Sequence, residues 1–403
     1  MNRKVLFISD HGDPLATLGG KQAGGQNNYV KQLALALDEL GFSIDVVTHW
    51  SDPNAPQIEK FGNDCRVIRI AAGHKGYIDK NEMFHILPKF YREMKGLLTR
   101  NAYRIIHSHY WLSGMIGLVL RRNFNIPLVH TSHSLAIAKL RGTGKKETRR
   151  LIAEKSILKN ADAVIATTPN EKQLIQEFAG RTENVVESSI GVNFNTFFPG
   201  KSDKQEDIMF TFAGRLEKTK GILTLLDAFQ LLMQRNPNIQ LVIVGGDKKD
   251  VDCDTFLPNK KELLEAIRGI EGNVWFVGPK SQEELAQIFH RSTAVVVPSY
   301  YESFGMVAAE AQACGTPVIA SKVGGLNDII LDGHTGFHVE PKNAEQLSNV
   351  MYKLSKNKRL VKKVGKQAAK YSQKVFDWRK IAKQIIQTYE RLVKKHEKVR
   401  ASY

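Results

Sequence analysis

The feature that most constrains the fold is a pattern of short apolar runs that alternate with helical segments, and this pattern occurs twice. The first series of apolar runs covers residues 4–9, 44–48, 67–70, 105–108, 128–131 and 163–167. The second series covers residues 208–213, 241–244, 274–277, 294–297 and 318–320. Strands that alternate with helices predict parallel sheets. The sequence therefore predicts two Rossmann-like α/β domains.

The stretch between the two series, residues 192–207, contains Pro199, Gly200 and five charged residues, which is typical of a linker. We expect one domain over residues 1–195 and a second over residues 205–377, with a C-terminal helix at 378–403 that joins the first domain. A chain of 403 residues is long enough to bury two cores. Two such domains are expected to face each other across a cleft, where ligands bind preferentially.

The net charge of +17 is concentrated near the C terminus, because residues 351–403 hold 17 basic and 3 acidic residues. This region is either a solvated basic helical face or a surface that attracts anionic lipid. Nucleic acid is disfavoured as a partner, because neither a recognition motif nor an aromatic stacking pattern accompanies the charge.

Several features indicate a cytoplasmic protein. No apolar run reaches the roughly 18 residues that a membrane-spanning helix needs, and the chain begins with a strand pattern rather than a signal peptide. Cys65, Cys253 and Cys314 are far apart and form no metal-ligand pattern. We expect neither a disulfide nor a structural zinc.

Two carboxylates eight residues apart, Glu302 and Glu310, surround a Phe-Gly turn that opens a short helix. Glu302 follows the apolar run 294–297, and Glu310 is expected about two turns into the helix. Open parallel sheets bind ligands at the carboxyl edge of their strands, and a helix that begins there directs N–H groups at an anion. The alternative is that both residues are surface charges on a helix that only packs on the sheet.

Cations follow another run at the same predicted edge. Arg215 and Lys220 come directly after the run 208–213 and could together hold a diphosphate. Gly24 and Gly25 run into a helix and allow an anion to approach the backbone, although a flexible turn explains them equally well. The glycines of this first loop lack the spacing of a dinucleotide site, which disfavours a nicotinamide enzyme.

Other candidate sites are weaker. Residues 141–146 resemble a phosphate loop, but Lys139 and Lys146 stand where such a loop needs Gly and Ser or Thr, so we reject an ATPase. His133 follows the run 128–131 and is expected to face the cleft or to be structural. His107 and His109 lack a third ligand with suitable spacing, so hydrogen-bonding roles are favoured over a metal. The Asp-x-Asp pattern at 250–254 is interpreted as a solvated loop.

As a set, these motifs resemble those of the retaining family 4 glycosyltransferases of the GT-B fold, over nearly the whole chain. The residues that carry the resemblance are Glu302-Ser303-Phe304-Gly305 through Glu310, Gly214-Arg215 with Lys220, Gly24-Gly25, and His133. Residues 107–114 and 298–326 are similar in particular to the transferase that joins GlcNAc to inositol phosphate in mycothiol synthesis, in a branch that includes the sucrose-phosphate synthases.

The resemblance implies a role for each matching residue. The first domain would bind the acceptor, and the second would bind the nucleotide sugar. Donor-binding residues would be Gly24, Gly25, Arg215, Lys220, Glu302, Ser303, Phe304, Gly305 and Glu310, and His133, Arg215, Lys220 and Glu302 would carry the catalysis. Glu310 would accept hydrogen bonds from the ribose and Glu302 from the sugar. The acceptor phosphate would be held by Lys80, Tyr110, Ser134 and Arg150.

The implied activity is transfer of a hexose or N-acetylhexosamine from a nucleotide-diphosphate sugar, expected to be UDP-linked, to a hydroxyl of a small sugar or polyol, with a phosphorylated acceptor consistent with Ser134. We expect no cofactor and no catalytic metal. Retention of the anomeric configuration normally suggests a covalent intermediate on a protein carboxylate. No carboxylate of the first domain can be placed beneath the anomeric carbon, so a same-face reaction is favoured. The alternatives are a sugar-nucleotide epimerase and a lipid glycosyltransferase peripheral to the inner face of the membrane. A homodimer is left open.

Overall fold

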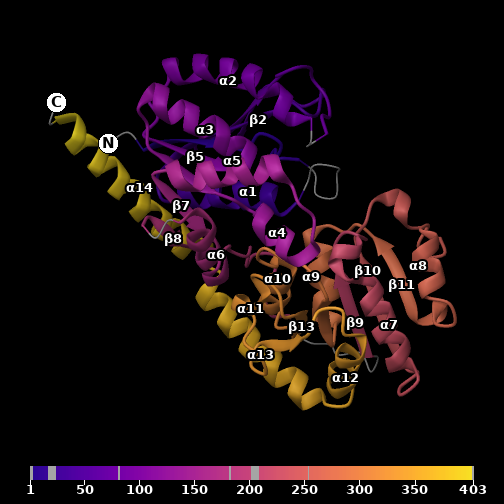
Figure 1. Ribbon diagram of the computed structural model, residues 1–403. Coiled ribbons are helices and arrows are strands. Elements are labelled where there is room, and N and C mark those ends of the chain that lie inside the picture. Colours follow the sequence, from indigo (N-terminus) through magenta and orange to yellow (C-terminus); the bar gives the residue numbers. More distant parts are fainter. Residues whose placement is uncertain are drawn as a thin grey trace. The chain divides into compact units, whose positions relative to one another are not determined.

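The computed structural model describes residues 3–16, 24–79, 82–180, 183–200, 208–252 and 254–401. The chain forms two compact units, which Figure 1 shows coloured along the sequence. The first unit comprises Met1–Leu140, Lys145–Gly191 and Trp378–Tyr403. The second unit comprises Arg141–Gly144 and Val192–Asp377.

The sheet of the first unit has eight strands within the described ranges, in the order β3-β4-β2-β1-β5-β6-β7-β8. The strands are β1 (Lys4–Ile8), β2 (Ser43–His49), β3 (Ile58–Phe61), β4 (Cys65–Ile70), β5 (Ile105–His109), β6 (Leu128–Thr131), β7 (Ala163–Ala166) and β8 (Val185–Glu187). Neighbouring strands are parallel except for β3 and β4. The central strands are apolar along their length because helices cover both faces of a parallel sheet.

Helices of the first unit come from both ends of the chain. They are α1 (Gly25–Asp38), α2 (Met83–Arg100), α3 (Trp111–Phe124), α4 (Ala136–Thr143, whose last three residues belong to the second unit), α5 (Thr148–Asn160), α6 (Pro169–Ala179) and α14 (Trp378–Ala401). Helices α2, α3, α5 and α6 pack side by side in that order, and α1 packs against α14. The C-terminal helix, yellow in Figure 1, buries Ile381, Ile385 and Tyr389.

The second unit is built on a parallel sheet that has six strands in the described part of the chain, in the order β11-β10-β9-β12-β13-β14. The strands are β9 (Ile208–Ala213), β10 (Ile239–Val244), β11 (Val274–Gly278), β12 (Ala294–Val297), β13 (Val318–Ser321) and β14 (Gly336–Val339). The helices are α7 (Ile222–Met233), α8 (Lys261–Ala266), α9 (Gln282–Arg291), α10 (Met306–Ala313), α11 (Leu326–Ile329), α12 (Ala344–Ser355) and α13 (Lys358–Val375). Short 3-10 helices are η1 (Lys218–Lys220), η2 (Lys248–Asp250) and η3 (Glu271–Asn273).

Each strand that the sequence predicts is present, with its ends within about two residues of the expected ones. Strands β3, β8 and β14 were not predicted. The parallel sheets set the position of candidate site residues, because the carboxyl ends of neighbouring parallel strands lie at one edge.

Candidate active site

The strand order of the second unit reverses between β9 and β12. From β9 the chain moves outward through β10 to β11, returns to the other side of β9, and continues through β12, β13 and β14. The pairing of β9 with both neighbours is parallel, so the carboxyl ends of β9 and β12 lie at the same edge. Open α/β sheets bind ligands at such a reversal. The loops after β9 and β12 are therefore the first place to look for a site.

Lys220 and Glu302, which follow these two strands, meet at the reversal. Lys220 Nζ donates a hydrogen bond to Glu302 Oε2 at 2.7 Å, and the two side chains are 24% and 18% exposed. Gly221 allows the loop after β9 to approach the loop after β12 closely, since its φ is 72° and a Cβ there would lie 1.9 Å from the Pro298 carbonyl oxygen. Ser299 Oγ also donates to Glu302 Oε2, at 3.3 Å. The structure thus brings two of the predicted donor residues into direct contact.

Glu310 is buried in α10 with no side-chain partner among the residues that the structure describes. Burial raises the pKa of this carboxyl to about 8, since a low-dielectric surrounding disfavours the charged form. The helix begins at Met306 after Gly305, whose φ is 103°. Glu310 is therefore the fifth residue of α10, little more than one turn from its N terminus, and not two turns as the sequence suggested.

The remaining predicted residues of this edge are less closely grouped. Arg215 is 73% exposed, and its Nη1 lies 2.7 Å from Glu217 Oε1. That Arg215 and Lys220 together hold a diphosphate stays a prediction. Ser303 Oγ lies 2.9 Å from the Tyr301 hydroxyl. Phe304 is buried, so what it offers to a ligand is its backbone.

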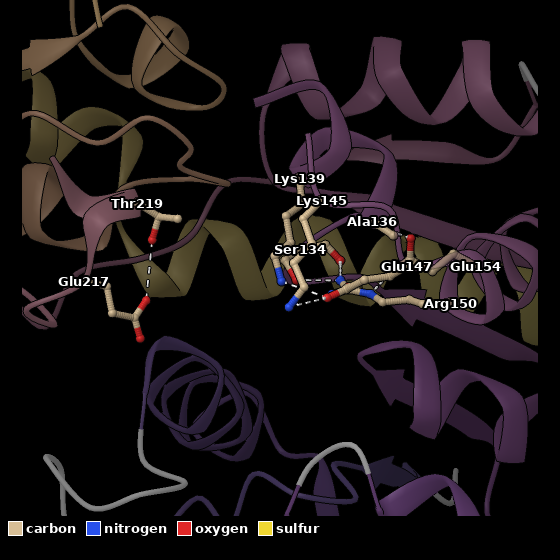
Figure 2. Close-up of polar contacts among 9 residues, drawn as sticks. All are labelled: Ser134, Ala136, Lys139, Lys145, Glu147, Arg150, Glu154, Glu217 and Thr219. Atoms are coloured by element: carbon tan, nitrogen blue, oxygen red, sulfur yellow. Dashed lines mark hydrogen bonds and ion pairs between the residues drawn. The ribbon is translucent and has the colours of Figure 1, made fainter. Parts of the chain in front are cut away.

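In the first unit, Arg150 contacts two of the other predicted acceptor residues. Its Nη2 donates to both the carbonyl oxygen and Oγ of Ser134 at 2.8 Å (Figure 2). Its guanidinium lies 4.8 Å from the centre of the Tyr110 ring. Its Nε donates to Glu154 at 2.6 Å and its Nη1 to Glu147 at 3.1 Å. Burial opposes the charge of Arg150, but Glu154, Tyr110 and Glu147 more than offset this, so its pKa is raised.

The other predicted residues of the first unit are placed as follows. Lys80 lies outside the described residues. Gly25 is the first residue of α1, and Gly24 precedes it in an extended conformation that any residue can adopt. A Cβ at Gly24 would meet no atom of the described residues within 4 Å.

His133 follows β6 with a φ of 59°, a conformation that non-glycine residues rarely adopt outside functional sites and turns. Its Nε2 lies 3.1 Å from His109 Nδ1. His107 hydrogen-bonds the Tyr389 hydroxyl at 2.6 Å and Thr131 Oγ1 at 2.8 Å, as the sequence interpretation favoured. Burial, with a smaller contribution from neighbouring imidazoles, lowers the pKa of His107 to about 3 and that of His109 well below its usual value. These two histidines are neutral hydrogen-bonding groups.

Sequence reasoning missed a buried acid beside the predicted acceptor residues. Asp10 lies just beyond β1, accepts a hydrogen bond from the Ser113 hydroxyl, and has an Oδ2 3.4 Å from His11 Nδ1. The His11 ring packs edge-on against Tyr110, with ring centres 4.8 Å apart. The signal for Asp10 was available, since an acidic residue on the loop that follows a buried strand is the same pattern that singled out Glu302.

No cluster of three or more potential metal-ligating side chains occurs in the described ranges. The same part of the chain contains no helix with the length and apolar character needed to span a membrane.

Comparison with known families matches both halves of the chain. Residues 24–188 match a glycosyl transferase 4-like domain, and residues 194–371 match the glycosyl transferases of group 1. Together the two matches cover most of the sequence.

Relatives of the whole chain agree with these matches. The D-inositol 3-phosphate glycosyltransferase of Corynebacterium aurimucosum is 35% identical over 96% of this chain and 95% of its own. The protein of the same name from an Arthrobacter species is 34% identical over 97% and 96%. The solved sucrose-phosphate synthase of Thermosynechococcus elongatus is 37% identical, with a TM-score of 0.85 over 97% of this chain and 99% of that one. Anabaena HepE, at 20% identity and a TM-score of 0.73, shares the fold.

The chain therefore belongs to the group 1 glycosyltransferases and has the GT-B fold. The predicted fold class and the predicted resemblance to glycosyltransferases are both confirmed.

Proposed function

We propose that this glycosyltransferase moves a hexose or N-acetylhexosamine from a UDP-linked sugar to a hydroxyl of a small phosphorylated sugar or polyol, with retention of the anomeric configuration. The observation that carries the proposal is the pair Lys220–Glu302 at the reversal of the strand order. A cation for phosphates beside an acceptor for hydroxyls is the combination that a sugar diphosphate requires.

The donor is assigned to the second unit. Lys220, and Arg215 after its release from Glu217, would hold the diphosphate and offset the charge that develops as it leaves. Glu302 would accept hydrogen bonds from the sugar hydroxyls, with the backbone N–H groups of Phe304 and Gly305 beside it. Glu310 would accept them from the ribose, and hydroxyl donors of this kind favour its charged form.

The acceptor is assigned to the first unit. Arg150, Ser134 and Tyr110 are in contact, and a guanidinium beside a hydroxyl is a suitable binding group for a phosphate. Two relatives support a phosphorylated acceptor or product, since their names are D-inositol 3-phosphate glycosyltransferase and sucrose-phosphate synthase. His133, oriented by His109, would contact a hydroxyl of the transferred sugar.

The proposed reaction takes place on one face of the sugar. A bond forms between the acceptor oxygen and the anomeric carbon as the bond from that carbon to the diphosphate breaks, and the acceptor proton moves to the departing phosphate oxygen. No protein carboxylate acts as nucleophile or general base in this scheme. Lys220 and Arg215 neutralise the leaving group, so the reaction should proceed in the presence of EDTA.

The test begins with a thermal-shift screen of nucleoside diphosphate sugars, since a ligand that binds the folded state raises Tm. Donors that bind are then incubated with phosphorylated sugars and polyols and with their dephosphorylated forms, and products are identified by mass spectrometry. The proposal expects a new glycoside on the phosphorylated acceptors. Steady formation of an epimerised sugar without any acceptor would identify an epimerase instead and contradict the proposal.

A further inference from the structure

The carboxylate of Glu147 lies among three cations (Figure 2). Lys139 Nζ is 2.9 Å and Lys145 Nζ is 3.6 Å from Oε1, while Arg150 Nη1 is 3.1 Å from Oε2. Burial alone would raise the pKa of Glu147, but hydrogen bonds and charges from Lys139 and Arg150 lower it. Arg150 also contacts Glu154, so among these five residues three cations face two carboxylates and one positive charge is in excess.

The two carboxylates that contact Arg150 are held very differently. Glu154 is 2% exposed and fixed on both oxygens, by Arg150 Nε at 2.6 Å and by the Ala136 backbone N–H at 2.7 Å. Glu147 is 25% exposed, immediately precedes α5, and makes no capping bond to the helix. Glu154 therefore holds the guanidinium in place, whereas an outward rotation of the Glu147 side chain would break, among the described contacts, only its ion pairs with Lys139, Lys145 and Arg150.

We propose that Glu147 occupies the place of an anionic ligand group, and that a phosphate monoester displaces it to bind Lys139, Lys145, Arg150 and the Ser134 hydroxyl. The inference rests on the proposed function, whose acceptor would supply the phosphate. It adds Lys139 and Lys145 as ligands and makes Glu147 an internal competitor, roles that the resemblance did not imply for any of the three.

The geometry suits a dianion. Arg150 presents Nη1 to Glu147 and Nη2 to the Ser134 hydroxyl, so its outer edge can grip two oxygens of one phosphate once Glu147 has moved. The Tyr110 ring beneath the guanidinium keeps its plane in position. Among these five residues, once Glu147 has turned away, three cations face one carboxylate, Glu154, and a dianion balances that difference whereas a neutral acceptor does not.

If a phosphate displaces Glu147, removing the charge of Glu147 should strengthen anion binding. In the full-length protein, Glu147→Gln should lower the Kd for inorganic phosphate, measured by ³¹P NMR titration at fixed ionic strength, about five- to tenfold. Glu177→Gln, on the exposed part of α6 in the same unit, changes the net charge equally and should leave the Kd unchanged. Lys139→Met should weaken phosphate binding in both the wild-type and the Glu147→Gln backgrounds.

The outcomes separate this inference from the proposed function. Unchanged or weaker phosphate binding in Glu147→Gln, with a melting temperature equal to that of the wild type, would overturn the inference even if the wild type glycosylates a phosphorylated acceptor. Tighter phosphate binding without transfer to any acceptor would support the exchange and contradict the proposed function. For an active enzyme, the KM of the phosphorylated acceptor should fall in Glu147→Gln while that of the nucleotide sugar stays constant.

Discussion

The candidate acceptor residues of the first unit and the candidate donor residues of the second differ in how their charges are satisfied. Arg150 is surrounded by its own counter-charges, with Glu154 and Glu147 both in hydrogen-bonding contact. Glu310 has the opposite arrangement, because it is buried with neither a cation nor a hydrogen-bond donor among the described residues, and its pKa is raised to about 8. Arg150 therefore has carboxylate partners without a ligand, whereas the carboxyl of Glu310 would gain hydrogen-bond donors only from a ligand.

The difference indicates how each half would respond to its substrate. A ligand at Arg150 must displace an existing carboxylate, so its affinity depends on competition between two anions. A ligand at Glu310 supplies hydrogen-bond donors that are missing, so its binding should be coupled to loss of a proton. Four predictions test this contrast, from the largest expected effect to the smallest.

The largest effect is expected on stability when Arg150 is removed. Arg150→Ala leaves Glu154 buried without its cation, which should cost roughly 3–5 kcal/mol of unfolding free energy. The double variant Arg150→Ala/Glu154→Gln should recover part of this loss, because the amide oxygen can still accept from the Ala136 N–H. Urea unfolding of both variants measures the difference.

A matched control comes from an exposed pair in the same unit. Arg104 and Glu397 are 39% and 55% exposed, so Arg104→Ala should cost less than about 1 kcal/mol. If Arg104→Ala and Arg150→Ala destabilised the protein equally, the first unit would not depend on its buried charge pair.

The next effect concerns turnover. Lys220→Ala should reduce kcat about 10²–10³-fold, since it removes a charge that stabilises the departing diphosphate, while the melting temperature changes little. Lys218→Ala is the control on the same short helix, because Lys218 is 74% exposed and pairs with Glu262. Near-normal turnover by the Lys220 variant would eliminate the proposed role.

Nucleotide binding should depend on pH through Glu310. The ratio of the UDP affinity of the wild type to that of Glu310→Gln should rise with pH, by up to about tenfold per unit. It should level off once the pH exceeds the Glu310 pKa of about 8. At pH 9 the variant should bind about 10- to 100-fold more weakly, the loss expected for hydrogen bonds to a charged group. Calorimetric titrations in buffers of different ionisation enthalpy would also detect the released proton. A constant ratio of the two affinities across pH would show that no ligand donor contacts Glu310.

Over a single pH unit, the smallest effect is on stability as a function of pH. Between the usual value of 4.5 and about 8, the folded protein keeps a proton on Glu310 that the unfolded chain has released, so stability falls as pH rises. The slope from this group is at most about 1.4 kcal/mol per pH unit. Glu310→Gln should lose less stability than the wild type between pH 5 and pH 8. Equal losses would mean that Glu310 is solvated in the folded protein.

The sequence predicted those parts of the fold that are long and apolar. Strands such as β1 and β12 are continuous apolar runs, and their alternation with helices sets the class. Strand β3 was missed because its four residues, Ile58 to Phe61, form a partly exposed antiparallel edge in which Glu and Lys are adjacent, so they give neither an apolar run nor an alternation. Strand β8 has only three residues, and Gly-Phe-His-Val of β14 is interrupted by Gly and His, so neither gives an apolar run.

Site residues were predictable where position along a strand decides their place, as for Lys220 and Glu302. Contacts made by irregular segments were not. Residues 141–146 were dismissed as a phosphate loop on motif grounds, and only the structure places Lys145, with Lys139, against Glu147. The raised pKa of Glu310 depends on burial from all sides, which spacing along one helix does not encode.

The anomeric configuration of the first product tests the proposed retaining transfer most directly. Full-length enzyme would be incubated with UDP-GlcNAc or UDP-glucose and D-inositol 3-phosphate, and the reaction followed by proton NMR from its first minutes. We expect a glycoside with the α configuration of the donor, formed on the phosphorylated polyol and in the presence of EDTA. A β-glycoside as the first product, or transfer only to acceptors without phosphate, would contradict it.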